Sequence, residues 1–411
     1  MTTFLRSRWV ERPPHVEEIE PTALPAGFRA AGVAAGIKET GLDVGVLVSD
    51  EETASAARFS TNALLAAPVV VSKEAALDRI RAVVVNSGNA NVSDGERGLS
   101  TARAGQERAA ELLHLSPEEV GVASTGLIGR RLPPDRLLAG VRGAVDALAP
   151  EAGAFSEAIM TTDRAPKRAC LEVALASGKV RLAAQAKGAG MIAPRFATML
   201  CFVETDAALE PETVELLTAV TVKRSFDRIS VDGQLSTNDS VFAMASGASA
   251  VRVEPESPDE LALGEAMDAL LRQLALEIVA DGEGATRVGR VVVRGEGELV
   301  EPVARAVANS PLVKTALLGA DPNFGRVLQA AGQALAGRAP FVVDLHIEGH
   351  QVTSASAVID LAGEEWRELE RAMAAPEVEL TLTIPGEGGE TEVFFSDLTH
   401  DYVSLNSEYS T

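Results

Sequence analysis

The chain has 411 residues, of which 46% are hydrophobic and 23% charged, and its formal net charge is −22. This composition predicts a soluble globular protein with two or three domains or one large layered unit. The negative charge and the lack of a basic run argue against a nucleic-acid-binding protein. The two cysteines exclude a disulfide scaffold and a cysteine-rich metal site. The chain shows neither the apolar core of a secretory signal nor an apolar run of membrane-spanning length, so we expect a cytoplasmic enzyme.

Apolar and β-branched runs predict strands, and amphipathic runs predict helices. In chain order, strands are expected at 43–49, 68–72, 82–86, 120–124, 198–203, 240–245, 288–293, 341–346, 377–384 and 392–395. Helices are expected at 100–115, 136–148, 211–226, 258–280, 302–308 and 326–335, with a further helix that ends at Met160. Strands and helices mix without strict βαβ alternation, which predicts α+β layers and not a doubly wound parallel sheet.

Several polar turns lie where a predicted strand or helix ends, which is where sites often form. Thr125-Gly126 follows the strand 120–124, and a hydroxyl with a backbone N–H in this position can bind an oxyanion, although such a step alone is usually a plain turn. The loop 232–239 is rich in Asp and Asn but lacks the spacing of a calcium loop. Glu283 lies between two glycines, where it can point into a cleft or stay a solvated turn residue.

The stretch 187–200 places two glycines and a proline directly before a dense apolar run. These residues forbid a continuous helix or a central strand, so a small-residue turn should lead into a core strand. One interpretation is an ordinary loop that enters a sheet. The other is a cut between Ala197 and Thr198, which would make Thr198 a new N-terminus and a nucleophile.

The usual catalytic patterns are missing from the sequence. The five histidines show no metal-ligand spacing, because His346 and His350 flank a turn and share no helical face. The sequence contains no serine nucleophile elbow and no dinucleotide-binding fingerprint. A chain poor in His and Cys but rich in Thr and Gly turns favours an N-terminal threonine, whose own α-amine (pKa ~8) can take the hydroxyl proton.

Taken together, the motifs resemble one family, the ornithine acetyltransferases of arginine biosynthesis (glutamate N-acetyltransferase, ArgJ type). The resemblance spans nearly the whole chain, and its strength lies in the order of many short motifs. These are 27–38, 86–91, 124–126, 160–163, 187–194, 197–200, 281–286, 312–316, 321–326 and 406–411. The departures are Phe196, where a methionine is common, and Phe324, where a tryptophan is common, and neither carries chemistry.

The resemblance implies an α+β fold with a layered α/β/β/α sandwich core and smaller α/β lobes, of the self-cleaved N-terminal-nucleophile type (ArgJ/DmpA-like). It also implies that the chain cuts itself between Ala197 and Thr198. The products would be an α chain of residues 1–197 and a β chain of residues 198–411, which share one core. Two copies of each would assemble as an α2β2 tetramer.

The resemblance further implies a ping-pong acetyl transfer, in which Thr198 takes the acetyl group of N2-acetyl-L-ornithine and passes it to L-glutamate. Thr125 and Gly126 match the oxyanion hole. The substrate-binding positions of the family match Thr161, Lys187, Thr198, Glu283, Asn406 and Thr411. Lys187 suits a substrate carboxylate, and Glu283 suits the ornithine ammonium. We expect no metal and no bound cofactor; acetyl-CoA as a second acetyl donor stays open.

Two other functions compete with this reading. One is an N-terminal-nucleophile aminopeptidase or amidase, which would transfer the acyl group to water; related peptidases favour serine, so Thr198 counts against it. The other is a non-catalytic amino-acid-binding protein with the chain left intact. The sequence also leaves open whether Thr161 or Thr162 faces the substrate.

Overall fold

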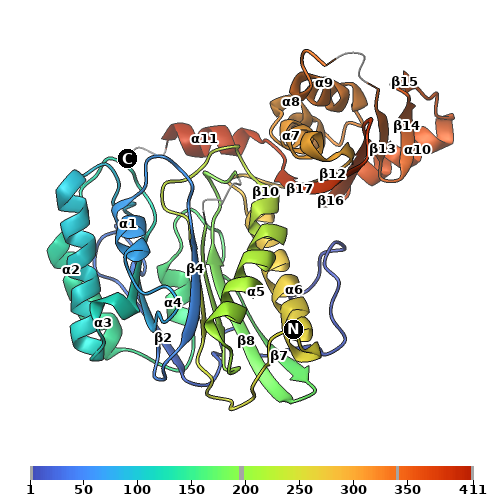
Figure 1. Cartoon of the computed structure of the whole chain (residues 1–411). Helices are drawn as coiled ribbons and strands as arrows, with labels where there is room; N and C mark the ends of the chain where they lie inside the picture. The colour runs from blue at the N-terminus through green and yellow to red at the C-terminus, as the bar shows by residue number, and fades with distance from the viewer. Residues whose placement is uncertain (1–2, 194–198, 339–341, 409–411) are drawn as a thin grey trace.

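The computed structural model describes residues 3–193, 199–338 and 342–408, and Figure 1 shows how its elements are arranged. Within these residues the strands form a six-stranded, a seven-stranded and a four-stranded sheet. Two sheets pack against each other in the larger part of the molecule, and the third lies in a C-terminal lobe. None of the helices in these ranges combines the length and the apolarity that crossing a bilayer requires.

The six-stranded sheet runs through the middle of the larger part. Its strands are, in spatial order, β1 (Val16–Glu18), β7 (Lys167–Leu175), β8 (Gly178–Lys187), β9 (Leu200–Thr205), β11 (Ser240–Ala245) and β4 (Ala54–Phe59). Every residue of β9 and β11 is buried, as expected of strands covered on both faces. The helices α5 (Pro211–Arg224) and α6 (Pro258–Ala280) cover one face of this sheet.

The four-stranded sheet forms the next layer. Its strands are, in order, β2 (Phe28–Val33), β3 (Val44–Ser49), β5 (Ala82–Asn86) and β6 (Val120–Ser124). Its outer face is covered by α1 (Ala67–Lys73), α2 (Gly95–Leu113) and α3 (Pro134–Asp146), and the 3-10 turn η1 (Pro117–Glu119) leads into β6. Since β5 and β6 are parallel, they end side by side.

Aromatic side chains fill the space between the two sheets. Phe202 of β9 stacks on Phe242 of β11 with ring centroids 6.1 Å apart, and Phe155 of α4 (Gly153–Ala158) meets Phe202 edge-on at 5.1 Å. The burial of each ring contributes about 2 kcal/mol to folding. A side chain at Gly121 would place its Cβ 2.6 Å from Phe242, so the close approach of the sheets needs glycine there. The layers of this part of the molecule are, in order, helices, a sheet, a second sheet and helices. The predicted α/β/β/α sandwich is therefore confirmed.

The C-terminal lobe contains the seven-stranded sheet. Its strands are, in order, β10 (Ile229–Ser230), β17 (Gly388–Ser396), β12 (Val288–Glu296), β16 (Glu377–Thr383), β13 (Asp344–Ile347), β14 (His350–Ser354) and β15 (Ala357–Val358). Helices α7 (Gly297–Ala308), α8 (Pro311–Leu318), α9 (Phe324–Ala334) and α10 (Gly363–Met373) pack on it. The strand β10, which follows the 3-10 turn η2 (Phe226–Arg228), pairs with β17 and so joins the lobe to the sandwich. The last helix, α11 (His400–Glu408), leads back from the lobe toward the sandwich (Figure 1).

One predicted element is wrong, and others were missed. Residues 68–72 were expected as a strand but lie in α1. Pro68 falls in the first turn of that helix, where its missing N–H has no cost. Burial of Val69 and Val71 outweighs their preference for strands. The hairpin β7–β8 and the helices α8, α10 and α11 had no counterpart in the prediction.

Candidate active site

The candidate site lies where one strand of each stacked sheet ends. In the six-stranded sheet, β8 ends at Lys187, which is the register partner of Leu200, the first residue of β9. In the four-stranded sheet, β6 ends at Ser124 and the chain turns at Thr125. The Lys187 ammonium donates a hydrogen bond to the Thr125 hydroxyl at 3.1 Å. This contact brings the two strand ends together.

Lys187 is a buried cation, with 3% of its surface exposed. Its ammonium also donates to the Thr161 hydroxyl at 2.9 Å and lies 4.0 Å from the Asp163 carboxylate. Burial lowers the pKa of Lys187, and the charge of Asp163 opposes that change. A buried ammonium that is held by hydroxyl groups and a carboxylate is suited to pair with a substrate carboxylate.

Asp163 fixes the geometry around this lysine. Its carboxylate accepts the N–H of Thr161 at 3.0 Å and of Gly188 at 2.7 Å, and it pairs with the Lys167 ammonium at 2.7 Å. Burial works against ionisation of Asp163, but the charges of Lys187 and Lys167 and these hydrogen bonds hold its pKa well below the usual range. The carboxylate therefore stays charged and ties the loop after α4 to the end of β8.

The turn after α6 brings an acidic group to the same strand end. The Glu283 N–H donates to Ala189 O at 2.8 Å, and the carboxylate lies against Gly190, where an added Cβ would come within 2.6 Å of Glu283 Cδ. Asn406 of α11 donates to Glu283 Oε2 at 2.7 Å. Because Ala189 and Gly190 follow Lys187 within three residues, these contacts place the acidic and the basic group at the same strand end.

The Thr125-Gly126 turn is held rigidly. The Thr125 N–H donates to Asn86 O at 2.9 Å. Gly126 has a φ of +126°, and a Cβ at this position would lie 2.4 Å from Gly88 C. Only glycine fits both the backbone conformation and the close approach. The turn next to the Lys187 ammonium is therefore held in one conformation, as a preorganised binding group has to be.

The structure brings together the predicted site residues that it describes. These are Thr125, Gly126, Thr161, Lys187, Glu283 and Asn406. Of the two neighbouring threonines, Thr161 is the one whose hydroxyl contacts Lys187. Ala197, Thr198 and Thr411 lie outside the described residues, so their roles stay predictions.

Two further charged residues at the site were not singled out from the sequence. One is Asp163, although it closes the motif 160–163. The other is Lys38, which donates to Met160 O at 3.1 Å and whose pKa is lowered by burial, with the charges of Asp43 and Asp163 acting in the opposite direction. In the sequence, only their membership in short family motifs could have pointed to Asp163 and Lys38. The sequence alone does not show that a charged side chain is buried.

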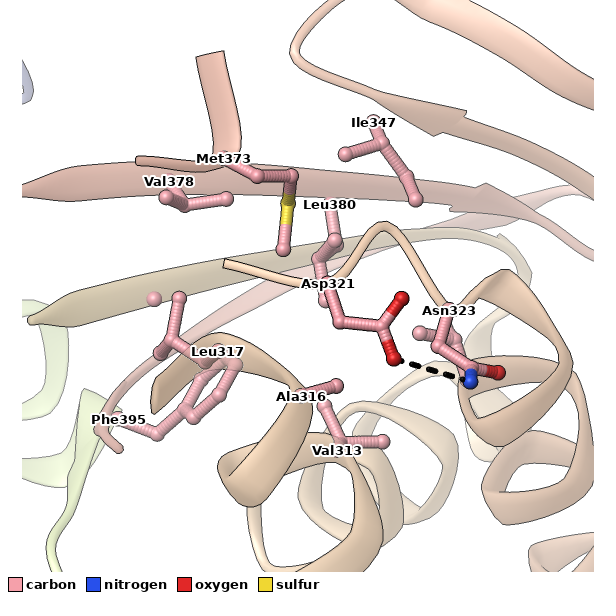
Figure 2. Close-up of a pocket in the computed structure, with 12 residues that line it drawn as sticks. Val313, Ala316, Leu317, Asp321, Asn323, Ile347, Met373, Val378, Leu380 and Phe395 are labelled. Atoms are coloured by element: carbon pink, nitrogen blue, oxygen red, sulfur yellow. Dashed lines mark hydrogen bonds between the residues drawn. The ribbon is translucent and has the colours of Figure 1, made fainter. Parts of the chain in front are cut away.

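A separate small apolar crevice lies in the C-terminal lobe between α8 and the sheet (Figure 2). Figure 2 shows Val313, Ala316 and Leu317 on one side and Ile347, Met373, Val378 and Leu380 on the other. Its polar rim consists of Asp321 and Asn323, which hydrogen-bond to each other at 3.2 Å. It contains none of the predicted site residues. In the described ranges, no group of three or more His, Cys, Asp or Glu side chains is arranged to hold a metal ion.

Comparison with known proteins agrees on one family. The sequence model of the ArgJ family matches residues 29–411. The chain is 43% identical over 397 residues to the arginine biosynthesis bifunctional protein ArgJ of Symbiobacterium thermophilum, with 94% of this chain and 98% of that protein covered. It is 37% identical over 400 residues to the glutamate N-acetyltransferase of Methanocaldococcus jannaschii, with 94% and 98% covered. A solved ornithine acetyltransferase from Mycobacterium tuberculosis, in complex with ornithine, gives 37% identity and a TM-score of 0.40 over 44% of this chain and 98% of that one. The chain belongs to the ArgJ family.

Proposed function

We propose that the protein is a glutamate N-acetyltransferase of arginine biosynthesis, which moves the acetyl group of N2-acetyl-L-ornithine to L-glutamate. The observation that carries the proposal is that the end of β8 in an ArgJ-family chain holds both a buried cation, Lys187, and, against Ala189 and Gly190, the acidic Glu283. The names of its relatives, which include a glutamate N-acetyltransferase and a bifunctional protein of arginine biosynthesis, support it.

The charges at the site offer a partner to the α-carboxylate of both substrates and to the ammonium of ornithine. Acetylornithine and glutamate each carry an α-carboxylate, for which the buried Lys187 ammonium is a partner. Ornithine also carries an ammonium group, for which the Glu283 carboxylate is a partner, with Asn406 orienting it. We expect Thr161 to orient the Lys187 ammonium through their 2.9 Å contact.

The proposed reaction starts with a self-cleavage. In the intact chain the Thr198 hydroxyl attacks the carbonyl of Ala197, and the cut leaves an α chain of residues 1–197 and a β chain of residues 198–411. The freed Thr198 amine then serves as the base for its own hydroxyl. Residues on both sides of the proposed cut pair within one sheet, through β8 and β9, so both chains would stay in the same core.

The acetyl group then moves in two steps. The Thr198 oxygen attacks the acetyl carbon of acetylornithine, ornithine leaves, and an acetyl ester remains on Thr198. The glutamate amine attacks that ester and leaves as N-acetylglutamate. In both steps the negative charge on the acetyl oxygen would be stabilised at the Thr125-Gly126 turn. Removal of one such donor typically costs about 100-fold to 1000-fold in rate.

The test of the nucleophile is to purify the protein, run a denaturing gel and sequence the N-termini. Two bands, with a second N-terminus at Thr198, are expected. The Thr198→Ala variant should stay a single chain of 42.9 kDa without activity. An intact and unprocessed wild-type chain would favour the non-catalytic binding protein, and a Thr198→Ala chain that is cut and active would end the proposal.

The test of the acceptor is to incubate the protein with acetylornithine, with and without glutamate. The transferase releases ornithine at the full rate only with glutamate present. Release at the full rate without glutamate would identify an amidase. A third arm with acetyl-CoA and glutamate tests a second acetyl donor, which the sequence leaves open. The native mass of the purified protein tests the expected α2β2 tetramer.

A further inference from the structure

Lys38 is a second cation at the candidate site, and no step of the proposed reaction uses it. It is the last residue of the glycine-spaced motif 27–38 and lies in the loop between β2 and β3. Its ammonium donates to Met160 O at 3.1 Å. The Lys187 ammonium donates to the hydroxyl of the next residue, Thr161, at 2.9 Å. The two ammonium groups therefore bind neighbouring residues of the loop after α4.

The Lys38 side chain also lies close to the Thr125-Gly126 turn, with Gly88 between them. A Cβ at Gly88 would come within 2.5 Å of Lys38 Cγ, and a Cβ at Gly126 would come within 2.4 Å of Gly88 C. The stem of Lys38 therefore packs on one side of Gly88 and the turn on another. Because β2 and β3 belong to the four-stranded sheet, Lys38 reaches the site from that sheet.

The loop that carries Lys38 is held in one conformation by a buried carboxylate. Asp43, directly before β3, is fully buried. Its Oδ1 accepts the N–H of Ala35 at 2.6 Å. Its Oδ2 accepts the N–H of Ile37 at 2.6 Å and of Lys38 at 2.9 Å. A binding group on a backbone that is fixed in this way loses little conformational freedom when a ligand arrives.

Lys38 is also a cation that is left available for a ligand. Among the described residues its ammonium has one hydrogen-bond partner, Met160 O, and no carboxylate pairs with it. Lys167, in contrast, pairs with Asp163 at 2.7 Å and with Asp281 at 2.5 Å. An ammonium has three N–H donors, so Lys38 can offer further hydrogen bonds to an anion.

The two substrates of the proposed reaction differ in charge at the end of the side chain. Acetylornithine ends in an ammonium, for which Glu283 is the proposed partner, whereas glutamate ends in a second carboxylate. We propose that Lys38 binds this side-chain carboxylate and so selects glutamate as the acetyl acceptor. The inference rests on the proposed function. Its basis is that two ammonium groups on neighbouring residues suit a ligand with two carboxylates.

The electrostatics around Lys38 favour such an anion. Burial lowers the pKa of Lys38, and the charges of Asp43 and Asp163 oppose this change. The charge of Lys187 adds to the lowering of the pKa, because like charges disfavour each other. An anion that binds to both ammonium groups offsets their repulsion. Glutamate should therefore be a better acceptor than glutamine, which has the same shape but a neutral amide at the end of its side chain.

The test compares glutamate with glutamine as acetyl acceptors for the purified protein. In a ping-pong reaction, kcat/KM for acetylornithine reports the first half-reaction, and kcat/KM for the acceptor reports the second. Lys38→Met removes the charge and keeps a stem of similar length. It should lower kcat/KM for glutamate by about 10-fold to 100-fold, as expected for the loss of one charged hydrogen-bond partner. The values for glutamine and for acetylornithine should not change.

Arg136→Met is the matched control. The Arg136 guanidinium donates to Gly36 O in the same loop, so this variant loosens the loop and keeps the Lys38 ammonium. It should retain the wild-type preference for glutamate over glutamine. A loss of preference as large as that of Lys38→Met would show that the loop conformation, and not the charge, selects the acceptor, and the inference would be wrong.

Two further results separate a binding residue from a merely structural one. Lys38→Arg keeps the charge and should favour glutamate over glutamine more strongly than Lys38→Met does; an equally weak preference in both variants would overturn the role of the charge. Acetylornithine turnover in Lys38→Met shows that the variant is folded and processed. Equal losses for glutamate, glutamine and acetylornithine would identify a structural residue and also overturn the inference.

The outcome for the wild-type protein keeps this inference apart from the proposed function. Wild-type protein that moves no acetyl group from acetylornithine to glutamate refutes the proposed function itself. Wild-type protein that acetylates glutamate and glutamine equally well, or a wild-type preference that Lys38→Met retains, refutes only the role of Lys38.

Discussion

The sandwich and the C-terminal lobe bury different kinds of side chain. At the strand ends of the sandwich the buried charged residues form a group, namely Lys167, Lys187, Asp163 and Asp239. In the described part of 288–397 the core is almost wholly aliphatic, and Lys314 and Asp397 are its buried charged residues. A buried charge costs several kcal/mol unless it is paired, so a fold accepts a group of them only where they have a use. We therefore expect the sandwich to carry the chemistry and the lobe to contribute mainly to stability.

The largest expected effect is loss of activity on removal of the site lysine. Lys187→Met should lower kcat/KM for acetyl transfer by about 100-fold or more, because the partner of the substrate carboxylate is lost and removal of one member of a buried charge pair costs about 2–5 kcal/mol. The matched control is Lys314→Met in the lobe, where the ammonium donates to Ser396 O. That variant should keep its kcat/KM, and equal losses in both variants would contradict the assignment of chemistry to the sandwich.

The next effect concerns the lobe. Leu382 of β16 is fully buried in the aliphatic core, and Leu382→Ala should destabilise the protein by about 3 kcal/mol through lost burial and a cavity. Thermal unfolding measures the loss. Activity per folded molecule should be unchanged at a temperature where the variant is folded. An active-site defect at full folding would show that the lobe takes part in the chemistry.

A third prediction concerns Glu204, a buried carboxyl group outside the candidate site, and tests whether its burial affects stability alone. Burial raises the pKa of Glu204 from 4.5 to about 8, although a hydrogen bond from Gln185 opposes this. The folded chain thus keeps a proton that the unfolded chain releases above pH 4.5, and it loses stability as the pH rises toward 8. Glu204→Gln should remove this loss and exceed wild type by about 4 kcal/mol at pH 8, with little difference at pH 4.5. Thermal unfolding at the two pH values checks this, and a lower stability of the variant at pH 8 would contradict it.

The smallest expected effect is at a helix cap far from the site. The Ser257 hydroxyl accepts the Glu260 N–H at 3.1 Å at the start of α6. Ser257→Ala should cost about 1 kcal/mol of stability, because that N–H loses its partner. Denaturant unfolding measures the change, and kcat/KM should stay the same. A change in kcat/KM would mean that α6 couples to the Glu283 turn at its other end.

Much of this arrangement could be predicted from the sequence. The α+β layers followed from the mixture of elements, and the motif order pointed to Lys187, Thr161 and Glu283, which the structure brings to one site. The helix at 68–72 could not be predicted, because its valines are buried by contacts distant in sequence. The contacts of Asp163 and Asp239 could not be predicted for the same reason. Each binds backbone groups of another segment. The residue type alone does not show whether a charged side chain is buried in the fold or lies on the surface.

The pairing of β8 with β9 has a consequence for assembly. The connection between them contains the proposed cut, and the register partners Lys187 and Leu200 lie in neighbouring strands. While the connection is intact, it keeps the two strands at a high effective concentration and they pair as parts of one molecule. After the cut the same pairing would become a meeting of two separate chains, and refolding would depend on protein concentration. Such a protein must fold first and cut afterwards, and once cut it retains its structure mainly through slow unfolding.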